Sequence, residues 1–246
     1  MPDTADKPNV SVDASTFPRS IQWSSRAVLH NLTSADIRLS KEEIVELRPM
    51  LWNDLCSEYD AQPFSRQLDK LGHKYSPDFL SFISAWRKDE WNHYLGFRSV
   101  FSLLYGEHED DVHQRVACRI PKFSPISEFL TDEFTICLLL AYDEIATTKS
   151  YSMDHKLYRS VGNPAFLEWI RMVTRDEAFH FRNCMEVVAR EHQDRVQEIP
   201  ALVDKFIQWD LTAHDYEATF VLDHTGDYFT SDFLHHCGEL MVKYFR

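Results

Sequence analysis

The chain has 246 residues, of which 44% are hydrophobic, and a formal net charge of −13 at pH 7. This charge argues against a nucleic-acid-binding protein, because phosphate recognition draws on clustered lysines and arginines. With only six glycines and no Gly-rich loop, the chain also lacks the signature of a dinucleotide or P-loop nucleotide site. The five cysteines are scattered without a Cys-x-x-Cys pair, which indicates neither a disulfide framework nor a zinc knuckle.

Three segments are expected along the chain. Residues 1–40 are interpreted as an N-terminal arm, because residues 1–20 are rich in Ser, Thr, Asp and Pro. Residues 41–222 are expected to form one helical bundle, and residues 223–246 a C-terminal tail packed on it. No apolar run approaches the roughly 18 residues that span a bilayer, and no secretory signal is evident. We therefore expect a cytoplasmic protein without a membrane span.

The first long helix begins after residue 40. Ser40 and Glu43 match a capping box, which predicts a helix start. The apolar stripe of this helix continues through Leu55, and the next position on the stripe is Glu58, where a core residue would be expected. Pro63 is expected to bend or end the helix.

A second helix is predicted from the Ser-Pro-Asp sequence at residues 76–78 to about Gly106. Its inner face carries Glu90 and His93 among large apolar side chains. The acidic run at residues 107–111 is interpreted as a solvated loop.

Residues 127–158 predict a third long helix with Glu144 on its apolar stripe, and a fourth helix follows with Glu177 and His180 on its inner face. A fifth amphipathic helix is expected over residues 201–220. No strand-like alternation is evident, so the sequence predicts an all-α fold.

An acidic residue followed three positions later by His occurs four times in the chain. About two such pairs would arise by chance from this composition. The four pairs are Glu90/His93, Asp110/His113, Glu177/His180 and Asp232/His235. We interpret the second and the fourth as incidental, because neither lies on the apolar face of a long predicted helix.

The remaining two pairs and the two other inner acids form a candidate metal-ligand set. Its members are Glu58, Glu90, His93, Glu144, Glu177 and His180. Four buried carboxylates would carry a charge of −4, which two divalent cations would neutralise while the two imidazoles complete the coordination. Oxygen-rich ligation with two imidazoles suits iron or manganese better than zinc. The alternative is a helical bundle whose inner acids form hydrogen bonds or salt bridges, for instance with Arg87, Arg171 or Arg175.

The order Glu, Glu-x-x-His, Glu, Glu-x-x-His resembles the ferritin-like di-iron carboxylate proteins. The gaps of 54 residues from Glu90 to Glu144 and 33 residues from Glu144 to Glu177 look most like those of the soluble acyl-carrier-protein desaturases. This resemblance implies a ferritin-like four-helix bundle with additional flanking helices. It also implies two iron ions, with manganese as the alternative in one position, O2 as co-substrate, and a homodimer.

The resemblance extends to two residues with roles other than ligation. Thr147 corresponds to the desaturase Thr beside the oxygen site, and Asp176 to an Asp that orients a ligating His of the other motif. Asp54 is the alternative to Glu58 as the ligand from the first helix, because the gap to Glu90 is shorter than in desaturases.

The implied function is an oxygen-dependent di-iron oxidase of the desaturase or hydroxylase type, acting on an acyl chain that a carrier protein could bear. An external ferredoxin-type or flavoprotein-type donor would supply electrons, because the chain has no flavin or iron–sulfur motif. One alternative is an oxygenase or N-oxygenase that acts on a small metabolite or amine. A narrow aliphatic tunnel in the structure would argue against this alternative. The N-oxygenase subtype with a third His has no match here, since Val173 occupies that position. Another alternative is a non-catalytic ferritin-like protein that handles iron.

Overall fold

The computed structural model describes residues 17–212, 220–222, 224 and 228–245. Within these residues all regular structure is helical, which confirms the all-α prediction. The elements in chain order are α1 (Ser25–Leu29), η1 (Ser34–Asp36), α2 (Lys41–Leu71), α3 (Pro77–Tyr105), α4 (Glu109–Ala117), η2 (Ser127–Phe129), α5 (Glu133–Ser160), α6 (Pro164–Glu191), η3 (Gln193–Glu198), α7 (Ile199–Thr212) and α8 (Ser231–Lys243).

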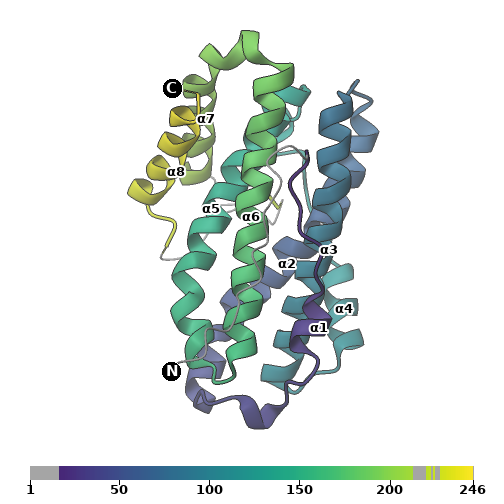
Figure 1. The fold of residues 1–246 in the computed structure, drawn as a ribbon, viewed down its shortest axis with the longest axis vertical. Helices are drawn as coiled ribbons and strands as arrows, with labels where there is room; N and C mark the ends of the chain where they lie inside the picture. The colour runs from purple at the N-terminus through teal and green to yellow at the C-terminus, as the bar shows by residue number, and fades with distance from the viewer. Residues whose placement is uncertain (1–16, 213–219, 223, 225–227, 246) are drawn as a thin grey trace, which may run out of the picture.

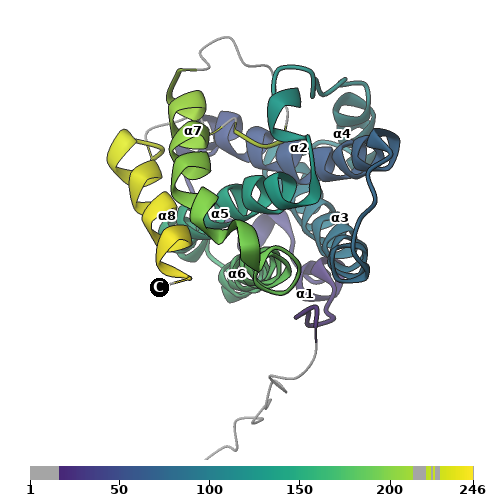
Figure 2. The ribbon, with the colours of Figure 1, turned by 90° about the horizontal axis from the view of Figure 1, so that it is seen from above.

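Four long helices form the centre of the molecule as two antiparallel pairs (Figure 1). The α2–α3 pair and the α5–α6 pair are each closed by a short turn, and the connection that carries α4 joins them. Viewed along the bundle, α7 and α8 pack beside α5, whereas α4 lies on the other side against α2 and α3 (Figure 2). No helix in the described part of the chain is long and apolar enough to cross a bilayer.

The ends of the long helices follow local sequence signals. Ser40 and Glu43 form the predicted capping box, with the Glu43 amide donating to Ser40 Oγ at 3.2 Å and the Ser40 amide donating to Glu43 Oε2 at 2.7 Å. Ser76 caps α3 through the Phe79 amide. Gly72 ends α2 in the left-handed conformation, with φ of 69°, which a side chain would oppose.

Of the two outcomes predicted for Pro63, an end of the helix is contradicted, because α2 continues through Pro63 for eight more residues. A helix-interior proline costs about 3 kcal/mol, since it removes one backbone hydrogen bond and crowds the preceding turn. Phe64 and Leu68 lie beyond it and are buried in the core. Burial of two such side chains contributes roughly 1.5–3 kcal/mol each, which offsets that cost.

The acidic run at residues 107–111 is not a loop throughout, contrary to the prediction. Glu109 and Asp110 begin α4, where negative charge interacts favourably with the helix N-terminus. Glu107 forms ion pairs with Arg48 and Arg115. The local excess of acid is therefore compensated by a helix terminus and by arginines.

Two other predicted boundaries differ from the structure, and the tail contains a helix. The third long helix begins at Glu133 after the Asp132 cap, and a short 3-10 turn occupies residues 127–129. The fifth helix runs from Ile199 to Thr212, and residues 213–219 lie outside the described residues. The tail contains α8, which packs on α5 and α7 and buries Leu234, Cys237 and Met241.

The N-terminal segment from residue 17 lies against the bundle, with α1 in contact with α3 and α6. The Ser25 amide donates to Asn92 Oδ1 at 2.8 Å, and Trp169 Nε1 donates to Ser25 Oγ at 3.0 Å. Asn183 holds the preceding residues by exchanging two 2.9 Å hydrogen bonds with the Arg19 backbone. Residues 1–16 of the predicted arm lie outside the described residues.

The bundle has two apolar cores, one toward each end. One contains Phe64 of α2 and Trp86 of α3, together with the first half of α5 and the second half of α6. The other contains Leu55 of α2, Phe97 of α3 and Trp169 of α6. The polar side chains described next lie at the level between these cores.

Candidate metal centre

Six buried side chains from the four long helices meet at the middle of the bundle. They are Glu58 of α2, Glu90 and His93 of α3, Glu144 of α5, and Glu177 and His180 of α6. Each is at most 3% exposed. The sequence placed these residues on four inner helix faces, and the structure brings all six together.

The six side chains form two groups that are each able to hold a metal ion, with the ligand atoms of each group within 4.8 Å of one another. Glu90 and Glu177 belong to both groups. Glu58 and His93 complete the first group, and Glu144 and His180 complete the second. Two sites that share two carboxylates are the geometry in which Glu side chains can bridge a pair of ions.

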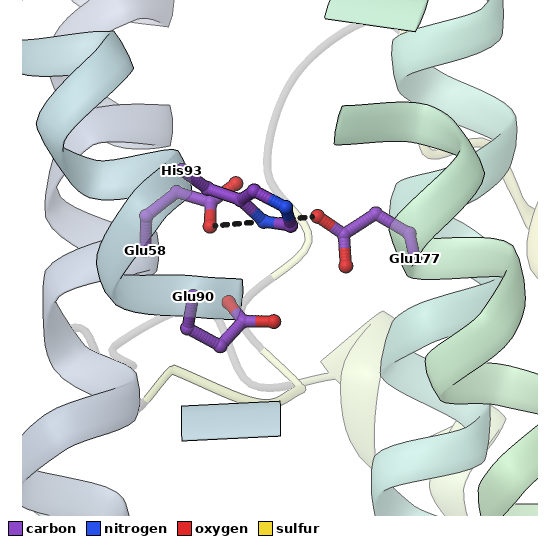
Figure 3. A group of neighbouring side chains, drawn as sticks. All are labelled: Glu58, Glu90, His93 and Glu177. Atoms are coloured by element: carbon purple, nitrogen blue, oxygen red, sulfur yellow. Dashed lines mark ion pairs between the residues drawn. The ribbon is translucent and has the colours of Figure 1, made fainter. Parts of the chain in front are cut away.

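The first group is drawn in Figure 3, where Glu58 and Glu177 approach the His93 ring from opposite sides. His93 Nδ1 lies 3.3 Å from Glu58 Oε2 and 3.0 Å from Glu177 Oε1. Glu90 lies one helical turn from His93 on α3 and points toward the same centre. The imidazole nitrogen and the carboxylate oxygens therefore converge on one position.

The second group repeats this arrangement around His180. Its Nδ1 atom lies 3.1 Å from Glu90 Oε1, 3.2 Å from Glu144 Oε2 and 3.0 Å from Glu177 Oε2. The two oxygens of Glu177 thus face the two different imidazoles. Because both rings turn Nδ1 toward the carboxylates, we assign Nδ1 as the ligand atom of each His.

The outer nitrogens of both imidazoles face aspartates of the opposite motif. His93 Nε2 lies 3.4 Å from Asp176 Oδ2, and His180 Nε2 lies 3.4 Å from Asp89 Oδ2. Such a carboxylate fixes the ring orientation and favours the tautomer whose inner nitrogen is free to ligate. Asp89 was missed in the sequence, although the shared Asp-Glu-x-x-His pattern of the two motifs would have identified it.

Two further aromatic residues position the inner carboxylates. Trp86 Nε1 donates to Glu144 Oε1 at 2.7 Å, and the Tyr151 hydroxyl donates to Glu58 Oε1 at 2.6 Å. Each of these bonds engages one oxygen of a glutamate and leaves the other oxygen directed at the centre. They come from α3 and α5, so the long helices hold one another's ligands in place.

The buried cluster contains four polar atoms that make no hydrogen bond within the described residues, although each lies at ion-pair distance from an imidazole or a carboxylate. Glu58 Oε2, Glu90 Oε1, His93 Nδ1 and Glu177 Oε1 are buried and make no hydrogen bond. Buried polar atoms without partners cost several kcal/mol unless an unobserved group completes them. These atoms face the centre of the cluster, with Glu90 Oε1 beside His180 and the other three beside one another, so the residues fit a bound cation.

Arginines do not neutralise the cluster within the described part of the chain. All ion pairs recorded for its four glutamates there are to His93 and His180. Arg175, one of the arginines considered as a partner, pairs with Asp176 instead. Within the described residues these glutamates therefore pair with the two imidazoles and accept hydrogen bonds from Trp86 and Tyr151, and not from arginines.

The protonation equilibria reflect this concentration of negative charge. Burial raises the pKa of Glu144 to about 8, and burial with the charges of Glu177 and Glu58 raises the pKa of Glu90 well above its usual range. Burial alone would lower the pKa of His93, but the neighbouring carboxylates outweigh it and raise that pKa. Without metal, the cluster holds protons where cations would otherwise bind.

A cavity of about 520 Å³ adjoins the cluster between α2 and α5. Glu58, Glu90, Glu144 and Glu177 form part of its wall. Most of the other polar side chains of the wall, including Thr147, lie about one helical turn or more from these glutamates. A small molecule therefore has space beside the candidate metal sites.

The other residues singled out in the sequence lie outside the cluster. Asp54 lines the cavity one turn before Glu58 but belongs to neither ligand group, so Glu58 is the ligand candidate from α2. Thr147 lies on the cavity wall three residues after Glu144, and its role stays a prediction. His113 faces the Tyr94 hydroxyl at 2.7 Å, and His235 is exposed on α8, as expected of incidental pairs.

Trp23 was the least foreseeable residue of the site, because it lies in the segment before α1. Its indole Nε1 donates to Asp176 Oδ2 at 2.5 Å. Together with the contact of Asp176 to His93, this forms a continuous polar row from a half-buried indole to the cluster.

Comparisons with protein-family models, with curated proteins and with solved structures found no match for this chain.

We expect metal loading to stabilise the fold, because ions that bind only the folded cluster shift the unfolding equilibrium. At a free metal concentration one hundred times Kd, the free energy of unfolding should rise by about 2.7 kcal/mol per site. Calorimetric unfolding with added Fe(II) under argon, and again after a chelator, measures this. An unchanged melting temperature at saturating metal would contradict binding to the folded state.

Replacement of Asp176 by Asn should weaken the first site, and Asp89→Asn should weaken the second. Loss of such an orienting carboxylate typically lowers metal affinity about 10–100-fold. Competition with a chromogenic chelator measures the two affinities, and the exposed Asp204→Asn on α7 serves as control. Equal affinities in all three variants would show that these aspartates do not orient the imidazoles.

Proposed function

We propose that this chain is an oxygen-dependent non-haem oxidoreductase that holds two iron ions in a ferritin-like four-helix bundle. The observation that carries this proposal is the convergence of four buried glutamates and two imidazoles as two ligand groups sharing Glu90 and Glu177. Two antiparallel helix pairs with one long crossover are the topology typical of ferritin-like bundles. The carboxylate-rich donor set favours iron, with manganese as the alternative in one position.

The residues of the chain prepare this site in two ways. Glu90 and Glu177 link the two positions, so that both ions can act on one O2 molecule. Trp86 and Tyr151 hold the outer oxygens of Glu144 and Glu58 by hydrogen bonds. The other oxygen of each carboxylate is thereby kept directed at the centre of the cluster. When bound, two ferrous ions supply the reducing equivalents that activate O2 for attack on a C–H or N–H bond.

Electrons for repeated turnover would come from an external donor of the ferredoxin or flavoprotein class. We propose that this donor approaches near Trp23, because the row Trp23, Asp176, His93 connects a half-buried side chain to the cluster. His93 and Asp176 also keep a proton close to the site. The homodimer that the resemblance implies remains part of the proposal.

Two substrate classes follow from different observations. The resemblance to desaturases suggests an acyl chain, borne by a carrier protein and desaturated or hydroxylated. The cavity beside the cluster favours the second class, a small polar metabolite or amine, because acidic and hydroxyl side chains make up much of its wall. A purely aliphatic tunnel would have favoured the acyl chain.

A non-catalytic iron-handling protein is the competing function, and stoichiometry separates the two. The test is anaerobic loading with Fe(II), exposure to O2 with a chemical reductant, and product analysis against acyl carriers, free acids and amines. Two irons per chain with repeated O2 consumption and an oxidised organic product would support the proposal. Loading of many irons per chain, or a single turnover without product, would support iron handling instead.

A further inference from the structure

The part of the cavity away from the metal cluster contains a second pair of carboxylates. Asp54 lies one turn before Glu58 on α2, and Asp154 comes from α5; both line the cavity. Asp154 is only 4% exposed. Asp54 Oδ2 and Asp154 Oδ1 are buried and have no hydrogen-bond partner in the described residues.

The hydroxyl of Tyr158 adds a third unsatisfied oxygen. Tyr158 lies one turn after Asp154 on α5, is 2% exposed, and its hydroxyl makes no hydrogen bond in the described residues. Burial raises the pKa of the Tyr158 hydroxyl, and the charges of Asp54 and Asp154 raise it further. The two carboxylate oxygens that line the cavity without partners indicate a missing donor of hydrogen bonds.

The missing partner is positively charged. The four cavity glutamates are accounted for by the metal cluster, and Asp143 faces His224 at 3.5 Å. No Lys or Arg is among the described residues that line the cavity. Asp54 and Asp154 therefore have no cation from the described part of the chain, and burial raises the pKa of Asp154 to about 6.

The rest of the cavity is suited to an organic molecule rather than to a bare ion. Pro49, Met50, Phe220 and Phe229 contribute apolar wall. Its volume of about 520 Å³ lies within the 300–1,000 Å³ typical of small-molecule sites and far exceeds that of one inorganic ion. A primary ammonium group carries three N–H donors and one positive charge, which match the unsatisfied oxygens.

We propose that the substrate of this oxidoreductase is a small primary amine, whose ammonium group binds between Asp54 and Asp154 while its apolar part lies along Met50 and the Phe side chains. This inference rests on the proposed function, because it names the substrate class of the same site. Asp54 and Asp154 are then specificity residues, and the metal-facing end of the cavity receives the part of the molecule remote from the nitrogen.

Calorimetric titration of the iron-loaded chain under argon tests this with three probes of equal shape. Hexylammonium should bind with a stoichiometry of one per chain, whereas its neutral counterpart 1-hexanol and the anion hexanoate should not saturate the site. The Asp54→Asn and Asp154→Asn variants should each weaken hexylammonium binding by roughly tenfold or more, because each removes one partner of a buried charge pair. The exposed Asp204→Asn variant is the matched control and should bind as the unsubstituted chain does.

Three results would overturn the inference: equal binding of 1-hexanol, unchanged hexylammonium affinity in both cavity variants, or displacement by equimolar KCl or MgCl2. Thermal unfolding of each variant verifies folding, which we expect because Asn keeps the shape of Asp and removes a buried charge. Iron content, measured in the same samples, separates the two proposals. Two irons without hexylammonium binding contradict only the substrate class, whereas hexylammonium binding by a chain that cannot hold iron contradicts the proposed function.

Discussion

The Glu177→Ala variant is expected to bind neither metal ion. The two oxygens of Glu177 face different imidazoles, with Oε1 3.0 Å from His93 Nδ1 and Oε2 3.0 Å from His180 Nδ1. Glu177 belongs to both ligand groups, so its loss removes a ligand from each position and one of the charges that attract the second cation. Iron per chain after anaerobic loading, measured by mass spectrometry, should fall from two to none.

The matched control for this experiment is Glu168→Ala on the same helix, because Glu168 is exposed and belongs to neither group. It should retain both irons. Glu90→Ala, the other shared ligand, should repeat the result of Glu177→Ala. Two irons in the Glu177→Ala chain would show that the ions bind at another place in the protein.

Glu144→Ala and Glu58→Ala should each remove one ion and leave the other. Glu144 belongs only to the group around His180, and Glu58 only to the group around His93. Both variants should hold one iron per chain, and O2 consumption should drop to the level of the metal-free protein, because one ion alone cannot supply both reducing equivalents. His180→Ala should behave as Glu144→Ala does.

Circular dichroism accompanies these measurements, and the helical signal should persist in all the variants. Removal of a buried carboxylate lowers the repulsion in the metal-free cluster, which compensates in part for the cavity left behind. Full O2 consumption by Glu144→Ala with one iron would contradict a paired site. Retention of both irons by Glu144→Ala and His180→Ala would rule out the assigned ligands.

The sequence was sufficient to identify the six cluster residues because helical periodicity is a local property. Glu58, Glu90, Glu144 and Glu177 interrupt apolar stripes at positions that must face inward, whatever the arrangement of the helices. The capping box at Ser40 was equally local and was confirmed. The continuation of α2 beyond Pro63 was not foreseen because the favourable burial beyond it depends on the whole bundle.

Contacts between distant segments were not predictable in the same way. Trp23 precedes α1, and no periodicity places its indole beside Asp176, which is 153 residues away. That Asp54 and Asp154 line the same cavity depends on how α2 and α5 are arranged in space, so the sequence alone treated Asp54 only as an alternative ligand. The assignment of a substrate class therefore depended on the three-dimensional structure.

The position of the polar layer between two apolar cores also restricts how the helices can be aligned. A slip of α6 by one turn relative to α3 would bring Glu177 among the Phe and Trp side chains of one core and separate it from both imidazoles. Such a slip would be opposed by the burial of an unpaired charge, in the way that a single polar residue fixes the register of a coiled coil. The charged layer thus favours one register of the four long helices over registers shifted by a turn, which apolar packing alone would distinguish less strongly.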